Sequence, residues 1–188
     1  MEITLIRHGK PRLPSLNRLT ASAFSDWVRE YDASGLCSSS KPAAHVVRRA
    51  QACHAVVCSD LPRSVESADA LGLNGNILSS ALFNEAGLPV ADWRGLKLSP
   101  KLWAVMFRVF WLFGYARGSE SFAEAKTRAA EAGEALVALA REHGSVLFVG
   151  HGVYNRILAN QLRKSGWSGP KSPNSEHWGM TVYEYQST

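Results

Sequence analysis

The sequence lacks several features that would place it in a special class of protein. It holds only three cysteines, Cys37, Cys53 and Cys58, in 188 residues. Their odd number and their spacing fit no metal site, which predicts free thiols in a reducing compartment. No apolar run approaches the ~20 residues that cross a bilayer, and the acidic start of the chain is unlike a secretory signal. We therefore expect a cytoplasmic protein without a membrane partner.

Several catalytic and binding signatures are missing as well. The chain contains no Walker loop, no Gly-x-Gly-x-x-Gly fingerprint and no Gly-x-Ser-x-Gly elbow. A Cys-His hydrolase needs a thiol at a strand end, whereas Cys58 lies one residue inside its predicted strand. No nucleic-acid-reading motif accompanies the basic residues, so we expect no nucleic-acid partner.

What is present indicates one ordinary globular domain over residues 1–188. Hydrophobic residues make up 46% of the chain and charged residues 20%, which excludes a disordered protein. The 21 basic and 16 acidic residues give a net charge of +5. Basic side chains gather in two stretches without acids, 93–117 and 156–171. Such local positive fields suit an anionic ligand.

Apolar runs and helical patterns alternate along the chain. Short apolar runs predict strands at 3–6, 55–58, 76–80, 145–149 and 181–185, and helical spacing or caps predict helices at 62–71, 122–143 and 155–164. The second of these helices starts with a capping box, Ser121 and Glu124. Strands that are apolar throughout are buried on both faces, so we expect an α/β fold with a mostly parallel sheet covered on both sides by helices.

One segment departs from this pattern. From Leu102 to Phe113 every residue except Arg108 is apolar. A helix that is apolar all round has to be covered, which favours a buried or dimer-packing helix, with a lid over a pocket or a membrane-surface helix as further interpretations. We treat residues 92–117 as a lid or interface segment that shapes substrate preference. The apolar helix is also compatible with a homodimer, and the sequence does not decide the oligomeric state.

Polar side chains follow the predicted strands at the point where each strand ends. Arg7 and His8 follow the first strand, Arg63 the second, Glu85 the third and His151 the fourth. Ligands of open parallel sheets bind outside the carboxyl ends of the strands, so these side chains are predicted to converge. The remaining histidines have no partner at a useful spacing, and we expect solvent or core roles for them; they are His45, His54, His143 and His177.

This set suits phosphoryl transfer. Two guanidiniums match phosphate oxygens, and a neutral imidazole can attack phosphorus and form a covalent intermediate. A second histidine, when protonated, adds a donor, and a carboxylic acid can protonate the leaving oxygen. These groups supply positioning and charge without a metal or another cofactor.

The chain resembles the histidine phosphatase superfamily, which has the phosphoglycerate-mutase-like fold. The resemblance lies in five segments, in matching order and spacing, namely Leu5–Gly9, Ser59–Ala68, Asn84–Gly87, Gly118–Ser121 and Val149–Gly152. It implies a three-layer α/β/α sandwich. It further implies that His8 is the phosphorylated nucleophile, that Arg7, Arg63 and His151 hold the phosphoryl group, and that Glu85 is the proton donor. A plain loop carboxylate is the alternative interpretation of Glu85.

The chain also departs from the family pattern. Pro11 and Pro14 stand where the family usually has a threonine and an asparagine, which puts phosphate contacts from that loop in doubt. The resulting hypothesis is a metal-independent phosphatase acting on a small phosphorylated metabolite or a phosphoprotein. The alternatives are a phosphoglycerate-type mutase and a non-catalytic module that binds a phosphorylated ligand or a protein.

Overall fold

A single mixed sheet forms the centre of the protein. The computed structural model describes residues 1–13, 17–73 and 77–186. Within them the strand order is β3 (Ile77–Ser80), β2 (Ala55–Ser59), β4 (Ser145–Gly150), β1 (Glu2–Arg7) and β5 (Met180–Glu184). β5 pairs antiparallel with β1, and the other pairs are parallel. The mostly parallel sheet is confirmed; the start predicted for the third strand, Asn76, lies outside the described residues.

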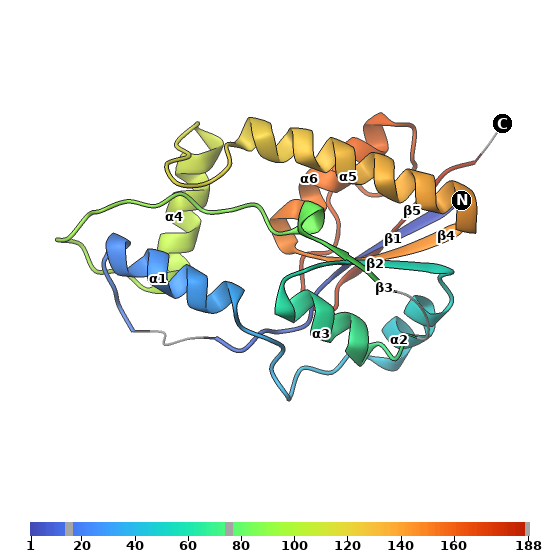
Figure 1. The fold of residues 1–188 in the computed structure, drawn as a ribbon, viewed down its shortest axis with the longest axis horizontal. Coiled ribbons are helices and arrows are strands. Elements are labelled where there is room, and N and C mark those ends of the chain that lie inside the picture. Colours follow the sequence, from blue (N-terminus) through green and yellow to red (C-terminus); the bar gives the residue numbers. More distant parts are fainter. Residues whose placement is uncertain (14–16, 74–76, 187–188) are drawn as a thin grey trace.

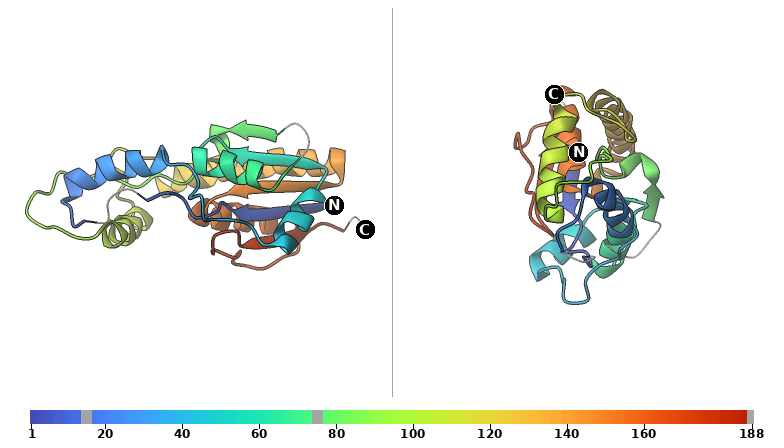
Figure 2. Two further views of the ribbon diagram at one scale, coloured as in Figure 1. Left: turned by 90° about the horizontal axis from the view of Figure 1, so that it is seen from below. Right: turned by 90° about the vertical axis from the view of Figure 1, so that its left-hand side faces the viewer.

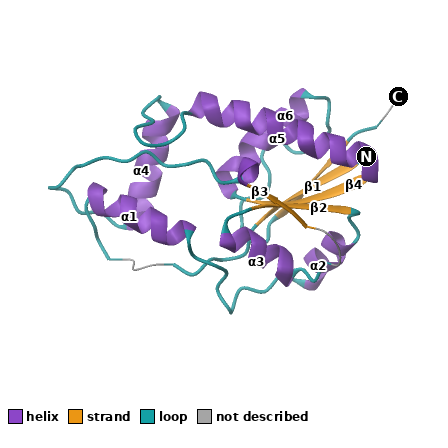
Figure 3. Cartoon of the chain, viewed as in Figure 1, coloured by secondary structure: helices purple, strands orange, loops and turns teal. Residues whose placement is uncertain are grey.

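Helices cover both faces of the sheet (Figures 1 and 3). α5 (Phe122–His143) and α6 (Gly152–Lys164) lie on one face, and α2 (Ala44–Gln51) and α3 (Pro62–Ala70) lie on the other. Because side chains alternate along a strand, β4 serves both cores. Its Val146 and Phe148 pack on the side of α5 and α6, while Leu147 and Val149 pack on the side of α2 and α3. The predicted three-layer sandwich is confirmed.

Local signals at the helix ends act as the sequence predicts. The capping box at α5 is formed, with Ser121 Oγ accepting from the Glu124 amide and Glu124 accepting from the Ser121 amide. Pro62 occupies the first turn of α3, where its missing N–H costs nothing. α6 begins three residues earlier than predicted, directly after His151. None of the described helices is long and apolar enough to cross a membrane.

Two helices extend beyond the carboxyl ends of the parallel strands as a smaller lobe, on the left of Figure 1 and of the first view in Figure 2. They are α1 (Ala21–Asp32) and α4 (Pro100–Leu112). Their contact is a cluster of apolar side chains that includes Phe24 of α1 and Trp103 and Phe107 of α4. Neither α1 nor α2 is predicted from the sequence.

The apolar segment 102–113 is covered on one side only. Trp103, Phe107 and Trp111 are fully buried, so the two tryptophans belong to the core rather than to a pocket wall. The opposite side of α4 is exposed in this chain; it consists of Leu102, Val105, Val109 and Leu112, and Phe113 follows directly after the helix. The helix is therefore buried on one side within the chain, and the dimer-packing and lid interpretations of its exposed side stay predictions.

Candidate active site

Four of the predicted site residues meet at the carboxyl edge of the sheet. The rings of His8 and His151 lie 5.0 Å apart between centroids, and both side chains are buried. Arg63, on the first turn of α3, is 1% exposed. The Arg7 guanidinium lies against the start of α6, where a Cβ at Gly152 would be 3.5 Å from Arg7 Cζ. The convergence predicted for Arg7, His8, Arg63 and His151 is present.

The hydrogen bonding of His8 leaves one ring nitrogen free to react. Its Nδ1 lies 2.7 Å from the carbonyl oxygen of Gly9. Because a carbonyl can only accept, Nδ1 carries the proton and Nε2 keeps its lone pair. Burial is the largest cause that lowers the pKa of His8 well below its usual value, and the charges of Arg63 and Arg7 lower it further. The ring is therefore neutral at pH 7, the state that a nucleophile requires.

His151 is held in a fixed orientation beside it. Its Nε2 lies 2.7 Å from the Ser59 hydroxyl, and its backbone amide donates to Asn155 Oδ1 over 3.1 Å. Burial, followed by the charges of His8 and Arg63, lowers the pKa of His151 well below its usual value. His151 is thus neutral at pH 7. From the sequence, His151 is expected to donate a hydrogen bond in its protonated form. That form requires a bound anion whose charge offsets the positive charges of the arginines.

Arg63 is fixed by the last turn of α1. Its Nη2 lies 3.0 Å from the Asp32 carboxylate, and its Nη1 donates to the Tyr31 carbonyl over 3.4 Å. The guanidinium also lies over the Tyr31 ring, with Cζ 4.6 Å from the ring centroid. These contacts fix the plane of the guanidinium, and an oriented fork of donors is what recognition of a phosphoryl group needs.

Three polar atoms of this cluster are buried without a hydrogen-bond partner among the described residues. They are Arg7 Nε, Arg63 Nε and His151 Nδ1. Buried polar atoms are nearly always paired, because an unpaired one costs about 1–3 kcal/mol. Two of the three atoms are donors on permanently charged groups. A tetrahedral anion held between these side chains would supply the missing acceptors.

The Glu85 carboxylate lies against the beginning of α6, the helix that directly follows His151. Its Oε2 accepts from the Val153 amide over 3.1 Å and its Oε1 from the Tyr154 amide over 2.8 Å. Carboxylates are favoured at this end of a helix. Glu85 is thus brought to the same edge of the sheet as His151, and its role as acid stays a prediction.

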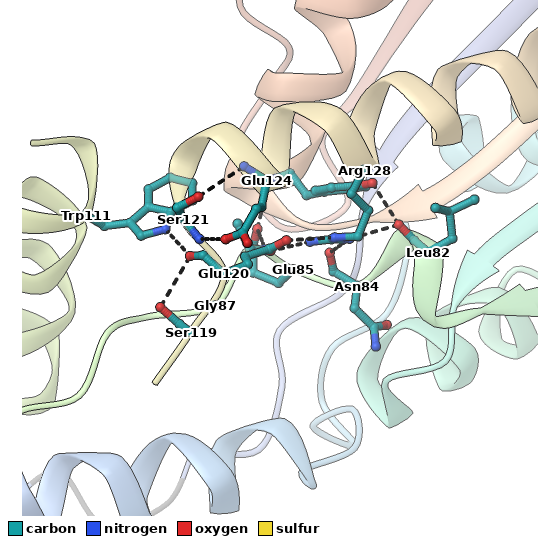
Figure 4. A network of polar contacts seen from close by, with 12 residues as sticks. Leu82, Asn84, Glu85, Gly87, Trp111, Ser119, Glu120, Ser121, Glu124 and Arg128 are labelled. Atoms are coloured by element: carbon teal, nitrogen blue, oxygen red, sulfur yellow. Dashed lines mark hydrogen bonds and ion pairs between the residues drawn. The ribbon is translucent and has the colours of Figure 1, made fainter. Parts of the chain in front are cut away.

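The segment that carries Glu85 is itself anchored by an arginine of α5 (Figure 4). Arg128 Nη1 donates to the carbonyls of Leu82 and Asn84 over 2.8 and 2.9 Å, and its Nε donates to Glu120 over 3.0 Å. Glu120 therefore accepts hydrogen bonds from Arg128 and helps to hold its guanidinium against this segment. The Asn84 side chain points away from the Arg128 guanidinium in Figure 4, and its Oδ1 is buried with no partner among the described residues.

Sequence reasoning missed several residues of the site. Asp32 and Tyr31 lie on the unpredicted helix α1, and Ser59 is a strand-end serine that the sequence did not link to His151. The expectation that His177 has no useful partner is wrong, because its ring lies 5.4 Å from that of His8 and its Nδ1 lies 3.1 Å from the His8 carbonyl oxygen. Those two residues are 169 positions apart, so no local pattern could reveal the contact.

The loop that follows the first motif is described up to residue 13 and again from residue 17. Pro11 forms an isolated antiparallel bridge with Leu36, and Pro14 lies outside the described residues. Within the described part of the chain, no group of three or more histidine, cysteine, aspartate or glutamate side chains could hold a metal ion.

Comparisons with known proteins place this geometry in context. The model of the histidine phosphatase superfamily (branch 1) matches residues 3–188. A search of the curated proteins found no match. Among solved structures, YhfR of Bacillus stearothermophilus aligns with a TM-score of 0.62 and 21% identity, covering 98% of this chain and 91% of that one.

Two further solved structures carry the names of phosphatases. The mycobacterial glucosyl-3-phosphoglycerate phosphatase Rv2419c, in complex with VO3, aligns with a TM-score of 0.62 and 20% identity over 96% of this chain and 91% of that one. A putative alpha-ribazole-5'-P phosphatase from Escherichia coli aligns with a TM-score of 0.55 and 18% identity over 86% of this chain and 79% of that one. At these identities the likeness establishes the fold.

Proposed function

The chain belongs to the histidine phosphatase superfamily, and from that premise we propose that it is a metal-independent phosphatase that hydrolyses phosphomonoesters through a phosphohistidine on His8. The observation that carries the proposal is a set of three buried polar atoms, on Arg7, Arg63 and His151, that have no partner among the described residues and belong to the cluster that holds the neutral His8 imidazole. The phosphatases named among the structural neighbours add support.

The first half of the reaction forms the covalent intermediate. The guanidiniums of Arg7 and Arg63 bind the phosphoryl oxygens, and His8 Nε2 attacks phosphorus with its lone pair. The bond between phosphorus and the ester oxygen breaks, and that oxygen takes a proton from the Glu85 carboxylic acid and leaves as an alcohol. Charge that gathers on the phosphoryl oxygens is stabilised by the two guanidiniums and by His151.

The second half regenerates the enzyme. A water molecule gives one proton to the Glu85 carboxylate while its oxygen bonds to phosphorus. The bond between phosphorus and Nε2 breaks, and its electron pair returns to the His8 ring. Inorganic phosphate leaves, and Glu85 is again a carboxylic acid.

His8→Ala tests the proposal directly. With an aryl phosphate as substrate, we expect turnover to fall by about a thousandfold or more, because a lost nucleophile is not replaced by its neighbours. The exposed His45 provides the matched control, since His45→Asn removes an imidazole from α2 far from the sheet edge. Mass spectrometry of the acid-labile phosphoryl adduct on quenched wild-type enzyme should place it on His8. Undiminished turnover by His8→Ala at equal purity would end the proposal.

The same assays separate the alternatives. A phosphatase releases inorganic phosphate, whereas a mutase interconverts phosphoglycerates. A non-catalytic module shows a phosphate-dependent rise in melting temperature without turnover. A panel of phosphorylated metabolites and phosphopeptides then identifies the substrate class.

A further inference from the structure

A short segment before β5 is bound to the backbone of the motif that carries His8. The Trp178 amide donates to the Arg7 carbonyl over 3.0 Å, and the Arg7 amide donates to the Gly179 carbonyl over 3.0 Å. Arg7 Nη1 donates to the Ser175 carbonyl. Residues 175–179, named here the clamp segment, therefore hold both the main chain and the side chain of Arg7.

The clamp segment contains the one non-glycine residue with positive φ in the described chain. Trp178 has φ 64°, a conformation that is rare for a bulky side chain and persists only where the surroundings impose it. Here they do so, because the indole packs so closely on Gly9 that a Cβ at Gly9 would overlap its ring, and its Nε1 donates to Ser40 Oγ over 3.0 Å. Such strain is concentrated at functional sites.

The neighbour of Trp178 places a third imidazole at the nucleophile. The ring centroid of His177 lies 5.4 Å from that of His8, against 5.0 Å for His151, and both rings are tilted against the His8 ring. His177 Nδ1 lies 3.1 Å from the His8 carbonyl oxygen. Since a carbonyl only accepts, Nδ1 carries the proton, and Nε2 is the nitrogen left for a further partner.

We propose that His177 is a third imidazole of the phosphoryl site and that its Nε2 binds a phosphoryl oxygen of the substrate through a shared proton. The inference rests on the function proposed above, because it takes the space beside His8 Nε2 as the place of the phosphoryl group. Its basis is the position of the ring beside the nucleophile, fixed by the bond to the His8 main chain and by the clamp segment.

The shared proton follows from the charges around His177. The charged and titratable groups beside it are Arg7 of β1, Lys10 of the following loop and the His8 ring, and its Nδ1 faces the His8 carbonyl. Burial and the charges of Arg7 and Lys10 lower the pKa of His177, while the bond to the His8 carbonyl raises it. The free ring is thus neutral at pH 7. A bound anion offsets both cations, and one proton then lies between Nε2 and the phosphoryl oxygen, on either partner.

Two substitutions separate this role from a purely structural one. In His177→Asn the side-chain amide stands in for Nδ1–H and keeps the bond to the His8 carbonyl, while nothing replaces Nε2. In His177→Ala both are lost. We expect His177→Asn to bind inorganic phosphate roughly tenfold more weakly than the wild type by calorimetry at pH 6, as expected for a hydrogen bond to a charged group. His45→Asn is the control and should bind like the wild type.

The pH dependence supplies a readout that a structural role does not move. The ratio of the dissociation constants of His177→Asn and wild type cancels the titration of phosphate itself. We expect this ratio to grow as the pH falls from about 8 to about 5.5, because the wild type gains a shared proton in that range and the variant does not. A ratio that stays constant with pH overturns the proposal.

The remaining outcomes are distinct. If His177→Asn binds phosphate as the wild type does while His177→Ala binds weakly, His177 only clamps the main chain of His8 and the inference fails, although the proposed function stands. If His8→Ala retains full turnover, the proposed function fails whatever the phosphate affinity of the His177 variants. A wild type that does not bind phosphate overturns this inference, while the turnover of His8→Ala still decides the proposed function.

Discussion

The buried guanidinium of Arg63 is paired with the carboxylate of Asp32 at 3.0 Å, although the two residues lie on different lobes of the protein. Arg63 belongs to α3, which packs on the sheet. Asp32 is the last residue of α1, the helix that packs against α4. A buried cation needs a counterion, and here the lobe formed by α1 and α4 supplies it. The lobe therefore takes part in building the proposed phosphoryl site.

Removing that counterion should make the protein depend on phosphate for stability. We expect Asp32→Asn to lower the free energy of unfolding by about 1–3 kcal/mol, because it leaves the Arg63 charge uncompensated. Inorganic phosphate should then raise the melting temperature of Asp32→Asn by more than it raises that of the wild type, since the anion replaces the lost carboxylate. Asp26→Asn, which breaks an exposed pair with Arg29 on the same helix, is the control. Equal phosphate shifts in all three proteins would contradict this account.

The two buried histidines should make stability fall in mild acid. In the folded protein the pKa values of His8 and His151 lie well below 6.5, so below pH 6.5 the unfolded chain binds protons that the folded chain does not. The stabilising contribution of these two groups is fully present above that pH and is lost as the pH falls. The free energy of unfolding then decreases by up to about 2.7 kcal/mol per pH unit for the two groups together. Urea unfolding between about pH 7.5 and 5.5 measures it. His151→Asn should show a shallower slope than the wild type, and an unchanged slope would show that His151 does not carry the effect.

Much of this site follows from patterns that are local in the sequence. Apolar runs mark β1, β2 and β4, and the polar residues that follow them meet because the carboxyl ends of parallel strands share an edge. The capping box at Ser121 and the proline at the start of α3 act within a single turn. For these features the cause lies within a few neighbouring residues, so the sequence is sufficient.

The parts that the sequence did not reveal depend on contacts between distant segments. α1 is stabilised by packing against α4 through Phe24, Trp103 and Phe107, and its own pattern gives little sign of that. The partner of His177 lies at the other end of the chain. The positive φ of Trp178 is imposed by Gly9 and Ser40, and no propensity of tryptophan favours it.

Leaving-group dependence should decide the role of Glu85. If Glu85 protonates the leaving oxygen, Glu85→Gln should slow hydrolysis of an alkyl phosphate by about 10²–10⁴-fold. An aryl phosphate with a strongly acidic phenol needs little protonation and should be affected far less. The melting temperature of the variant must be measured as well, because the Gln amide replaces one acceptor at the start of α6. Equal losses on both substrates would make Glu85 a structural carboxylate that caps α6.

Truncation on the buried side of α4 should lower the free energy of unfolding far more than truncation on its exposed side. Trp103 is fully buried and its Nε1 donates to the Leu19 carbonyl over 2.7 Å, so Trp103→Ala should lower the free energy of unfolding by about 3–5 kcal/mol. Phe113 is 88% exposed, and Phe113→Ser should change that free energy by less than about 0.5 kcal/mol. Denaturant unfolding of both variants measures the difference. A large loss for Phe113→Ser would mean that the outward side of α4 is covered in solution, and comparing its midpoint with that of the wild type at several protein concentrations would show whether a second copy covers it.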